Sequence, residues 1–198
     1  MAAGRPRAFD KEKALEAAMH VFWRNGYAGT SMAELTQAMG INKPSLYAAY
    51  GNKDQLFATA LEQYTRQYAS PSLEYLYAPG QPLDERINAH LKAVAKRICH
   101  PNLPPGCLLA NSTSEAGGDS ISPACRGLLT NIREETQQYL TAFFAQEQES
   151  GTISRQSSPK SLALYLMSIN SGMAVLARNG ATQDELDEII EHVVTTFV

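Results

Sequence analysis

The amino-acid sequence predicts an all-α protein of roughly nine helices and no sheet. Apolar side chains recur every three or four residues along most of the 198-residue chain, which is the spacing of one helix face. No run of alternating apolar and polar residues, the pattern of a half-buried strand, interrupts this spacing. Residues that cap helices stand where the apolar stripes begin and end. The sequence therefore favours a helical head followed by a larger helical body.

The apolar stripes place the helices in order along the chain. The first helix is expected over residues 10–25, with Leu15, Met19 and Phe22 on one face and Gly26 ending it. Two short helices and a longer one over residues 53–68 follow. The later stripes consist of Leu83, Ile87, Leu91, Val94 and Ile98; Leu128, Ile132, Tyr139 and Phe143; Leu162, Leu166, Ile169, Met173 and Leu176; and Leu186, Ile190, Val193 and Phe197. Proline, glycine and serine predict loops at residues 71–82, 101–106, 117–122 and 151–159.

Cap chemistry supports these boundaries. A capping box places a short polar residue three positions before an acid or amide, so that each side chain bonds the other residue's backbone N–H. The pairs that fit are Ser31 with Glu34, Asn52 with Gln55, and Thr182 with Glu185. Pro123 and Pro159 suit the first turn of a helix, where the missing N–H has no intrahelical partner, and Gly51 and Gly180 suit helix ends.

Charge is divided unevenly between the two parts. Residues 1–53 carry seven Lys or Arg against four Asp or Glu, a net charge of +3, whereas residues 54–198 carry ten against sixteen, a net charge of −6. The whole chain, at −3, is too acidic for a nonspecific nucleic-acid coat protein. The division predicts that only the first part contacts phosphate.

We expect a cytoplasmic protein without a membrane span. The first ten residues have no apolar core of a signal peptide, and no stretch of about 18 uninterrupted apolar residues occurs. The three cysteines, Cys99, Cys107 and Cys125, are an odd number without metal-ligand spacing, which is typical of reduced thiols.

Two short helices between Ser31 and Tyr50 have the spacing of a helix-turn-helix. The first covers residues 32–39, the second begins at Lys43, and the three residues between them include Gly40, which suits a tight connection. Asn42 can cap the second helix. Leu35, Met39, Ile41 and Leu46 are spaced to pack the two helices together.

The exposed positions of the second helix fit duplex DNA. Lys43, Ser45 and Tyr47 supply hydrogen-bond donors for base edges, and Pro44 offers a small apolar surface to a thymine methyl group. Further contacts, expected to hold phosphates, come from Ser31 at a helix N-terminus and from Tyr50 and Lys53.

Four motifs resemble the N-terminal domain of TetR-family repressors: FWRNGY at residues 22–27, TSM at 30–32, INKPSLY at 41–47 and NKDQLF at 52–57. The resemblance covers residues 9–60, and the order and spacing of the motifs are more specific than a helix-turn-helix alone. Thr36 stands where the family usually has alanine, and Tyr50 where phenylalanine is common. Neither departure changes size or shape enough to disturb the domain.

The resemblance implies a three-helix DNA-binding head at residues 1–53 and a helical ligand-binding and dimerisation body at residues 54–198. It implies a homodimer that binds a palindromic double-stranded operator and is released by a small molecule. The last two helices, residues 159–179 and 182–198, are expected to form the dimer interface, where Ser168, Ser171, Gly172 and Ala174 permit close approach. Two alternatives stay open: an activator that binds DNA in the same way, and a helical ligand-binding protein or enzyme whose head serves as an interaction module.

The candidate ligand-binding residues lie on the stripes of the body, where the same pattern is also typical of plain core. They are Tyr64, Tyr68, Leu91, Ile98, Leu108, Asn111, Tyr139, Phe143, Tyr165 and Met167. Cys107 opens a helix expected over residues 108–116, a position that can make a thiol reactive, and some members of the resembled family sense oxidants or electrophiles through a body cysteine. The four histidines show no metal-ligand spacing, and no catalytic motif occurs, so we expect no metal, no cofactor and no enzyme.

Overall fold

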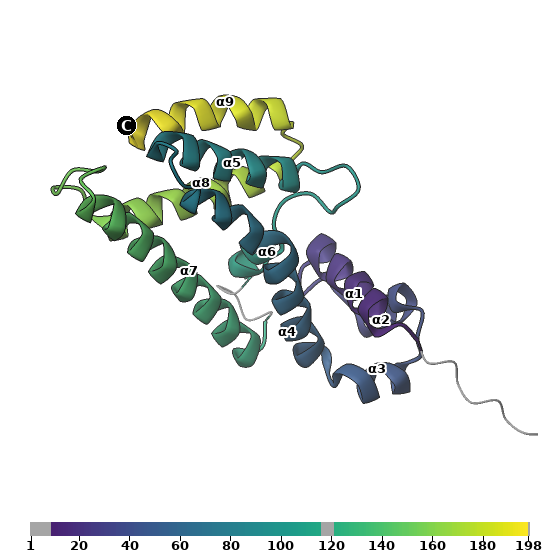
Figure 1. The fold of residues 1–198 in the computed structure, drawn as a ribbon. Helices are drawn as coiled ribbons and strands as arrows, with labels where there is room; N and C mark the ends of the chain where they lie inside the picture. The colour runs from purple at the N-terminus through teal and green to yellow at the C-terminus, as the bar shows by residue number, and fades with distance from the viewer. Residues whose placement is uncertain (1–8, 116–120, 198) are drawn as a thin grey trace, which may run out of the picture.

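A computed structural model describes residues 9–115 and 121–197, and within them every regular element is helical (Figure 1). The α-helices are α1 (Lys11–Asn25), α2 (Met32–Met39), α3 (Lys43–Tyr50), α4 (Lys53–Tyr64), α5 (Leu83–Ile98), α6 (Leu108–Glu115), α7 (Pro123–Glu149), α8 (Pro159–Arg178) and α9 (Gln183–Val194). A π-helix, η1 (Thr65–Ala69), and two 3₁₀ segments, η2 (Ser70–Tyr77) and η3 (Thr195–Phe197), complete the described elements. The all-α prediction is confirmed.

The predicted caps set the ends of the helices. Ser31, Asn52 and Thr182 each form the expected capping box with the residue three positions on. Pro123 and Pro159 lie in the first turns of α7 and α8, after the N-caps Ser122 and Ser158. These interactions satisfy N–H groups that a helix leaves unpaired at its start, and they explain why the sequence predicted the boundaries well.

Gly40 makes the turn between α2 and α3. Its backbone is left-handed, with φ of 65°, and its N–H bonds the carbonyls at the end of α2. A residue with a Cβ atom is disfavoured in this conformation, whereas glycine adopts it freely. The two helices are therefore joined at a fixed angle.

The segment after α4 differs from the loop predicted at residues 71–82. η1 continues the line of α4, and η2 extends it to Tyr77, so most of the segment is helical and the irregular part is confined to residues 78–82. The Ser72 hydroxyl donates to the Ala69 carbonyl at 3.0 Å, and Pro71 lies in the first turn of η2, where its missing N–H costs little. The predicted loop is therefore wrong for residues 71–77, because proline here begins a helical turn and does not break one.

The helices form a small head and a larger body (Figure 1). In the head, α1 packs against α2 and α4, and α3 lies at the outer edge. In the body, α7 packs along α8, α5 packs on α8 and η2, and α9 covers α5. α6 lies where the two parts meet and contacts α1, α4, α7 and α8.

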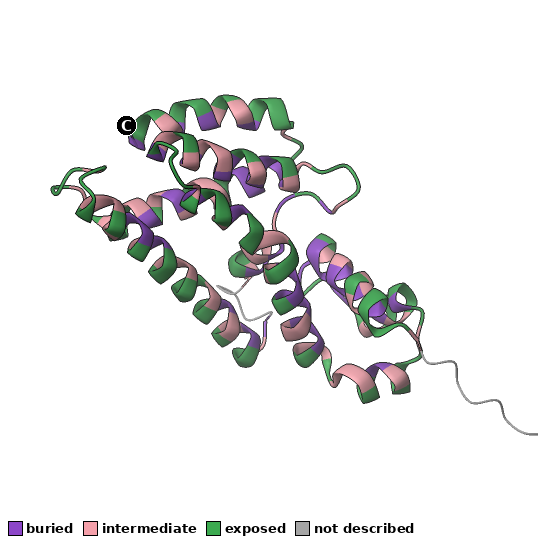
Figure 2. Ribbon diagram, viewed as in Figure 1, coloured by how far each residue is buried: buried purple, intermediate pink, exposed green. Residues whose placement is uncertain are grey.

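Two buried clusters correspond to these parts, as the purple segments of Figure 2 show. The first is built on α1 to α4 and also takes in Leu108, Ile121, Cys125 and Leu129. The second is built on α5, α7, α8 and α9. Apolar packing therefore continues across Lys53, the predicted end of the head, because α4 contributes Leu56, Phe57, Ala60, Leu61 and Tyr64 to the first cluster.

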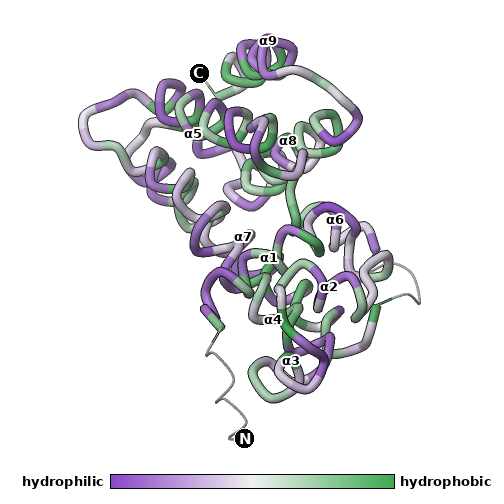
Figure 3. Tube along the Cα trace, turned by 90° about the vertical axis from the view of Figure 1, so that its right-hand side faces the viewer, coloured by the Kyte–Doolittle hydropathy of each residue, from purple (hydrophilic) through white to green (hydrophobic). Residues whose placement is uncertain are grey.

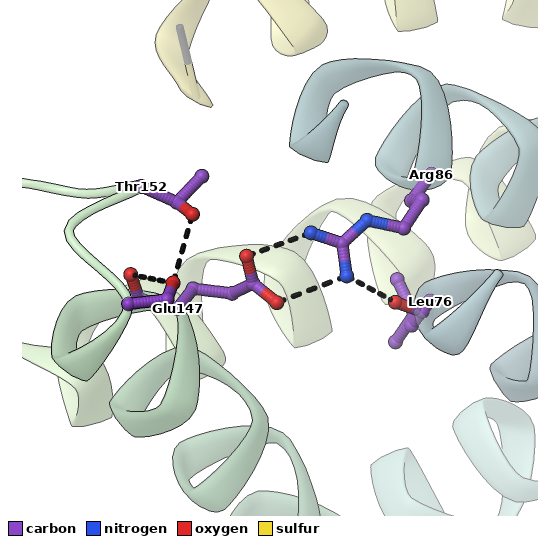
Figure 4. A network of polar contacts seen from close by, with 5 residues as sticks. Leu76, Arg86, Glu147 and Thr152 are labelled. Carbon is purple, nitrogen blue, oxygen red and sulfur yellow. Dashed lines mark hydrogen bonds and ion pairs between the residues drawn. The ribbon is translucent and has the colours of Figure 1, made fainter. Parts of the chain in front are cut away.

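A two-point ion pair fastens one end of the body (Figure 4). The Arg86 guanidinium on α5 donates to both carboxylate oxygens of Glu147 on α7, at 2.9 and 2.7 Å, and also to the Leu76 carbonyl of η2 at 2.9 Å. Both charged side chains are only 12% exposed. This bidentate geometry fixes the positions of η2, α5 and α7 relative to one another.

α8 leaves an unusual amount of apolar surface uncovered. Leu164, Val175 and Leu176 are all more than 40% exposed, and only 28% of the most apolar window of the helix is buried. Figure 3 shows α8 with green, hydrophobic segments along its length. By length and hydropathy alone this helix could cross a membrane, but the core helix of a soluble protein can have the same length and hydropathy.

Candidate DNA-binding surface and ligand cavity

α3 presents a short, rigid polar surface at the edge of the head. The Asn42 side chain accepts the Ser45 N–H at 2.9 Å and caps the helix, and Leu46 is fully buried and anchors it. Lys43 and Pro44 are exposed in the first turn, and the Tyr47 ring is 50% exposed one turn later. An exposed tyrosine with so little intramolecular contact is free to bind an external surface.

The other predicted DNA contacts have differing surroundings. Ser31 is exposed at the N-cap of α2, where its hydroxyl accepts the Glu34 N–H and also hydrogen-bonds the Glu34 carboxylate. The Lys53 ammonium lies 4.2 Å from the centre of the Tyr27 ring and is half-buried. The Tyr50 hydroxyl donates to the Lys11 carbonyl at 2.7 Å, so its proton ties α3 to the start of α1. A phosphate oxygen needs a donor, and Tyr50 has no second proton to offer.

Body residues hold the end of α1 and the turn after it. The Glu115 carboxylate, at the end of α6, accepts the N–H groups of Tyr27 and Ala28 at 2.9 and 3.2 Å. Gly26 has φ of 73°, and a Cβ atom there would lie 1.7 Å from a Glu115 carboxylate oxygen, so the contact requires glycine. The Arg178 guanidinium of α8 donates to the carbonyls of Trp23 and Arg24.

A cavity of about 610 Å³ lies between η1, η2, α5, α6, α7 and α8. Much of its lining is apolar and includes Leu73, Val94, Leu109, Ile132 and Met167. Its size is within the usual range for a small-molecule site. Thr65 and Ala69 of η1 also line it, so a ligand there would touch the direct continuation of α4.

Among the polar side chains on the cavity wall is one buried, hydrogen-bonded group. His90 is 1% exposed, its Nδ1 atom lies 2.9 Å from the Ser72 carbonyl, and its Nε2 atom lies 3.1 Å from the Asn170 amide nitrogen. Burial lowers the pKa of His90, which favours the neutral ring. Arg97 lines the same cavity and a second hollow of about 560 Å³ that is bordered by η1, η2 and α5.

Cys107 takes part in a chain of polar contacts. The Arg97 guanidinium donates to the Tyr64 hydroxyl at 2.5 Å, and that hydroxyl donates to the Cys107 sulfur at 3.2 Å. Cys107 immediately precedes α6 and lines the cavity. Cys99 and Cys125 lie outside it, and burial raises the pKa of both thiols.

The ten predicted ligand residues lie in different surroundings in the structure. Met167 lines the cavity and Tyr68 lines the second hollow. Several are fully or almost fully buried as core: Tyr64, Leu91, Ile98, Leu108 and Phe143. Tyr139 is exposed against Tyr77, Tyr165 packs against Phe197, and the Asn111 amide donates to the Trp23 carbonyl. The apolar stripes of the body thus mark its packing more than its cavity.

The sequence analysis missed His90, Asn170 and Arg97. His90 lies between Ile87 and Leu91 on the buried stripe of α5, and Asn170 lies between Leu166 and Met173 on that of α8. A polar residue inside an apolar helical stripe needs a partner in the fold or in a ligand. That interruption is the signal that could have found them. Among the described residues, no group of three His, Cys, Asp or Glu side chains could hold a metal ion.

Comparisons with known proteins agree with this geometry. The family model described as "Bacterial regulatory proteins, tetR family" matches residues 14–60, and that described as "Tetracyclin repressor-like, C-terminal domain" matches residues 84–193. The HTH-type transcriptional repressor ComR of Escherichia coli (strain K12) is 32% identical over 186 residues, covering 94% of this chain and 88% of ComR. The HTH-type transcriptional repressor BdcR of the same strain is 28% identical over 183 residues, covering 92% of this chain and 86% of BdcR.

A solved structure of similar sequence contains DNA. A cysteine mutant of the TetR family transcriptional regulator CifR, complexed with 26-bp double-stranded operator DNA, has a TM-score of 0.88 and 31% identity to this chain. The match covers 97% of this chain and 98% of that one. Two family models, near full-length relatives and the shared fold lead to one conclusion. The chain belongs to the TetR family of bacterial regulatory proteins, which are DNA-binding transcriptional regulators.

Proposed function

We propose that this protein is a cytoplasmic, homodimeric repressor that binds a palindromic operator and releases it when a small molecule enters the body cavity. The observation that carries the proposal is the capped, Leu46-anchored α3 helix with Lys43, Pro44 and Tyr47 exposed. Relatives named as repressors favour repression over activation. In this proposal residues 1–53 bind DNA, residues 54–198 bind the ligand and the partner subunit, and no catalysis is involved.

The proposed DNA contacts are divided by role. Lys43, Pro44, Ser45 and Tyr47 face the base edges of the major groove, whereas Ser31 and Lys53 hold phosphates. Tyr50 supports α3 from behind through its bond to Lys11. Because phosphate contacts release counterions, operator affinity is expected to fall steeply as salt rises.

The uncovered face of α8 supports the proposed dimer. Leu164, Val175 and Leu176 are exposed apolar residues, and Gly172 offers a place for close approach, since nothing lies within 4 Å of where its Cβ would be. The apolar face of α9 is buried on α5, and exposed acids such as Glu188 and Glu191 occupy its outer side. We therefore propose that α8 forms the centre of the interface and α9 its border. Two heads in such a dimer would read half-sites about 34 Å apart.

The cavity is connected to the head by two routes. η1 carries movement at Thr65 and Ala69 directly into α4. α6 begins beside Cys107 on the cavity wall and ends at Glu115, which bonds the turn after α1. A coupling of about 1–3 kcal/mol through these routes would change operator affinity by roughly 5–150-fold.

A gel-shift titration tests the regulator proposal. The full-length protein is titrated on DNA from upstream of its own gene with excess nonspecific competitor, and the variants Tyr47→Ala and Tyr75→Ala are compared with the wild type. Both tyrosines are about half exposed, but Tyr75 lies on η2, far from α3, and serves as the matched control.

The expected result is a specific shift that Tyr47→Ala weakens at least tenfold and Tyr75→Ala leaves unchanged. If the folded wild-type dimer shifts neither this DNA nor any member of a random-sequence library, the regulator proposal is overturned. Equal losses in the two variants would place the DNA-binding surface elsewhere.

We propose a second role, electrophile sensing by Cys107, on the strength of its contact with the Tyr64 hydroxyl. The Tyr64 hydroxyl donates to the Cys107 sulfur at 3.2 Å and itself accepts from Arg97, so the contact holds the sulfur in place. The thiol lies on the cavity wall, so a bound electrophile would be held next to it. Alkylation there would add bulk at the start of α6.

Iodoacetamide tests this role. The Cys107 sulfur forms a bond to the methylene carbon, iodide leaves, and the thiol proton passes to solvent. Alkylation should release the operator from the wild type and from Cys125→Ser, but not from Cys107→Ser. Unchanged operator affinity after mass spectrometry shows full alkylation of Cys107 would contradict it.

A further inference from the structure

We infer that the body cavity selects a largely apolar alcohol, whose hydroxyl group donates a hydrogen bond to the side-chain oxygen of Asn170. The inference rests on the proposed function in taking this cavity as the ligand site. It goes further by naming the chemical class of the ligand and the residue that recognises it.

The Ser72 carbonyl fixes the tautomer of His90. A carbonyl has no proton to give, so the 2.9 Å contact requires a hydrogen on Nδ1 of His90. The ring is buried among neutral groups with Arg97 nearby, and both burial and that positive charge lower the pKa of His90. The neutral ring therefore presents an unprotonated Nε2 atom, which can only accept.

His90 in turn fixes the amide of Asn170. The atom 3.1 Å from Nε2 must be the donating NH2 group, because the alternative orientation would set the amide oxygen against a nitrogen lone pair. The amide oxygen, Oδ1, is consequently turned away from His90. It is buried and has no hydrogen-bond partner among the described residues.

A buried acceptor without a partner is costly, and native proteins rarely keep one without a purpose. Asn170 lines the cavity, as do His90 and Ser72, which orient it. Two hydrogen bonds thus link three elements: the Ser72 carbonyl of η2 orients His90 of α5, and His90 orients the Asn170 amide of α8. The site calls for a ligand group with a hydrogen to donate.

Arg97 adds a donor to the same cavity. Its Nη1 atom is bonded to the Tyr64 hydroxyl, but its buried Nε atom has no partner, and none of the ion pairs among the described residues includes it. A hydroxyl group is the smallest group that both donates and accepts, so an alcohol suits a wall that offers both an acceptor and a donor. A carboxylate would satisfy Arg97 but leave Asn170 unpaired.

The rest of the cavity accounts for the apolar part of the ligand. Leu73, Val94, Leu109, Ile132 and Met167 make much of the wall apolar, and polar side chains such as Thr113, Arg133 and Thr136 lie among them. Its volume of about 610 Å³ admits a molecule of the size of a substituted aromatic ring or a medium alkyl chain. The hydroxyl would supply direction, and the apolar body would supply most of the affinity.

Three probes with one carbon skeleton test the inference: 2-phenylethanol, its methyl ether and phenylacetate. The ether keeps an acceptor oxygen but has no proton to donate, and phenylacetate carries only negatively charged acceptors. Isothermal titration calorimetry on the full-length protein, without DNA, gives each dissociation constant. We expect the alcohol to bind about five- to tenfold more tightly than either of the other two probes.

Two variants assign the preference to Asn170. Asn170→Leu removes the acceptor at similar volume and should bring the ratio of the alcohol and ether affinities close to one. Ile169→Leu, the preceding residue on the same helix, lies outside the cavity lining and should keep the wild-type ratio. Circular dichroism verifies that each variant is folded. If Asn170→Leu does not fold, the ratio of the alcohol and ether affinities in the wild type tests the inference by itself.

Equal binding of alcohol and ether by the wild type would overturn the inference, as would tightest binding of phenylacetate or a preference that survives in Asn170→Leu. Failure here is distinct from failure of the regulator proposal. Operator binding is measured without any probe, and probe binding is measured without DNA, so either can fail alone.

Discussion

The head and the body differ in how completely their groups are paired. In the head, Phe22, Tyr27 and Phe57 form a cluster of rings with centres 5.0 to 6.4 Å apart, and the Tyr27 hydroxyl donates to the Asp54 carboxylate. Among the described residues, the head has one buried side-chain atom without a hydrogen-bond partner, His20 Nε2, whereas the body has five, and two of these belong to the cavity-lining residues Asn170 and Arg97. This difference fits the function that we propose, in which the head holds α3 in one geometry and the body binds a ligand.

The largest effect is expected where the head core meets the body. Trp23 is fully buried, its ring lies 4.7 Å from that of Tyr64, and its Nε1 donates to the Gly106 carbonyl at 3.2 Å. Trp23→Ala should lower the free energy of unfolding by about 3–5 kcal/mol. Chemical denaturation followed by circular dichroism measures it.

Met167→Ala provides the comparison, because this side chain already faces the cavity and should lose less than about 1.5 kcal/mol. Equal losses in the two variants would mean that the cavity wall is as tightly packed as the head core. The contrast between the two regions would then be wrong.

A smaller effect is expected at the ion pair that fastens the body. Arg86→Met leaves the Glu147 carboxylate and the Leu76 carbonyl without their donor in a mostly buried place, and should cost about 3 kcal/mol. Denaturant titration of Arg133→Met gives the reference. The Arg133–Glu134 pair is about half exposed and should contribute almost nothing.

The neutral His90 predicts a pH dependence specific to the body. Its pKa is lowered in the fold, chiefly by burial, from an unfolded value near 6.5. The unfolded chain therefore binds the proton first, so stability is complete above pH 6.5 and is lost as pH falls from 6.5 towards the lowered value. The groups that face the ring are the Ser72 carbonyl, the Asn170 amide and Arg97.

Within that window the loss should approach about 1.4 kcal/mol per pH unit. Unfolding free energies of wild type and His90→Gln, measured from pH 7.5 to 5, give the contribution as a difference. The His20 pKa is also lowered by burial, but His20 is present in both proteins and cancels. Parallel pH profiles would show that His90 takes up its proton at the same pH in the folded and unfolded states, and the burial argument for its neutral ring would then be wrong.

The same contrast explains what the sequence could predict. Helix ends depend on local interactions, so Ser31, Asn52 and Thr182 were enough to set them. The surface of α3 could also be predicted, because Asn42 and Leu46 orient a short helix by themselves. Tyr50 was a harder case, since its hydroxyl bonds Lys11, 39 residues away.

The cavity could not be predicted from the sequence, because it forms where the packed helices leave space between them, and this packing depends on contacts between distant segments. Leu91 and Met167 belong to apolar stripes of the same kind, yet Leu91 is fully buried in the core and Met167 lines the cavity. Only the packing of η2, α5 and α8 brings Ser72, His90 and Asn170 together from three distant segments. The π-helix at Thr65–Ala69, whose first and last residues line the cavity, has no local sequence signal comparable to a cap.

The smallest expected effect lies in the link between the two regions. Glu115→Gln keeps the shape of the side chain but replaces two charge-assisted bonds to the Tyr27 and Ala28 N–H groups with weaker ones. The head would then be held less firmly, and operator affinity should fall about fivefold, corresponding to about 1 kcal/mol. Fluorescence anisotropy with labelled operator measures the change. Glu134→Gln, on the exposed side of α7, should have no effect. If Glu115→Gln binds the operator like the wild type, α6 does not set the position of the head, and η1 and α4 must carry the whole of the coupling.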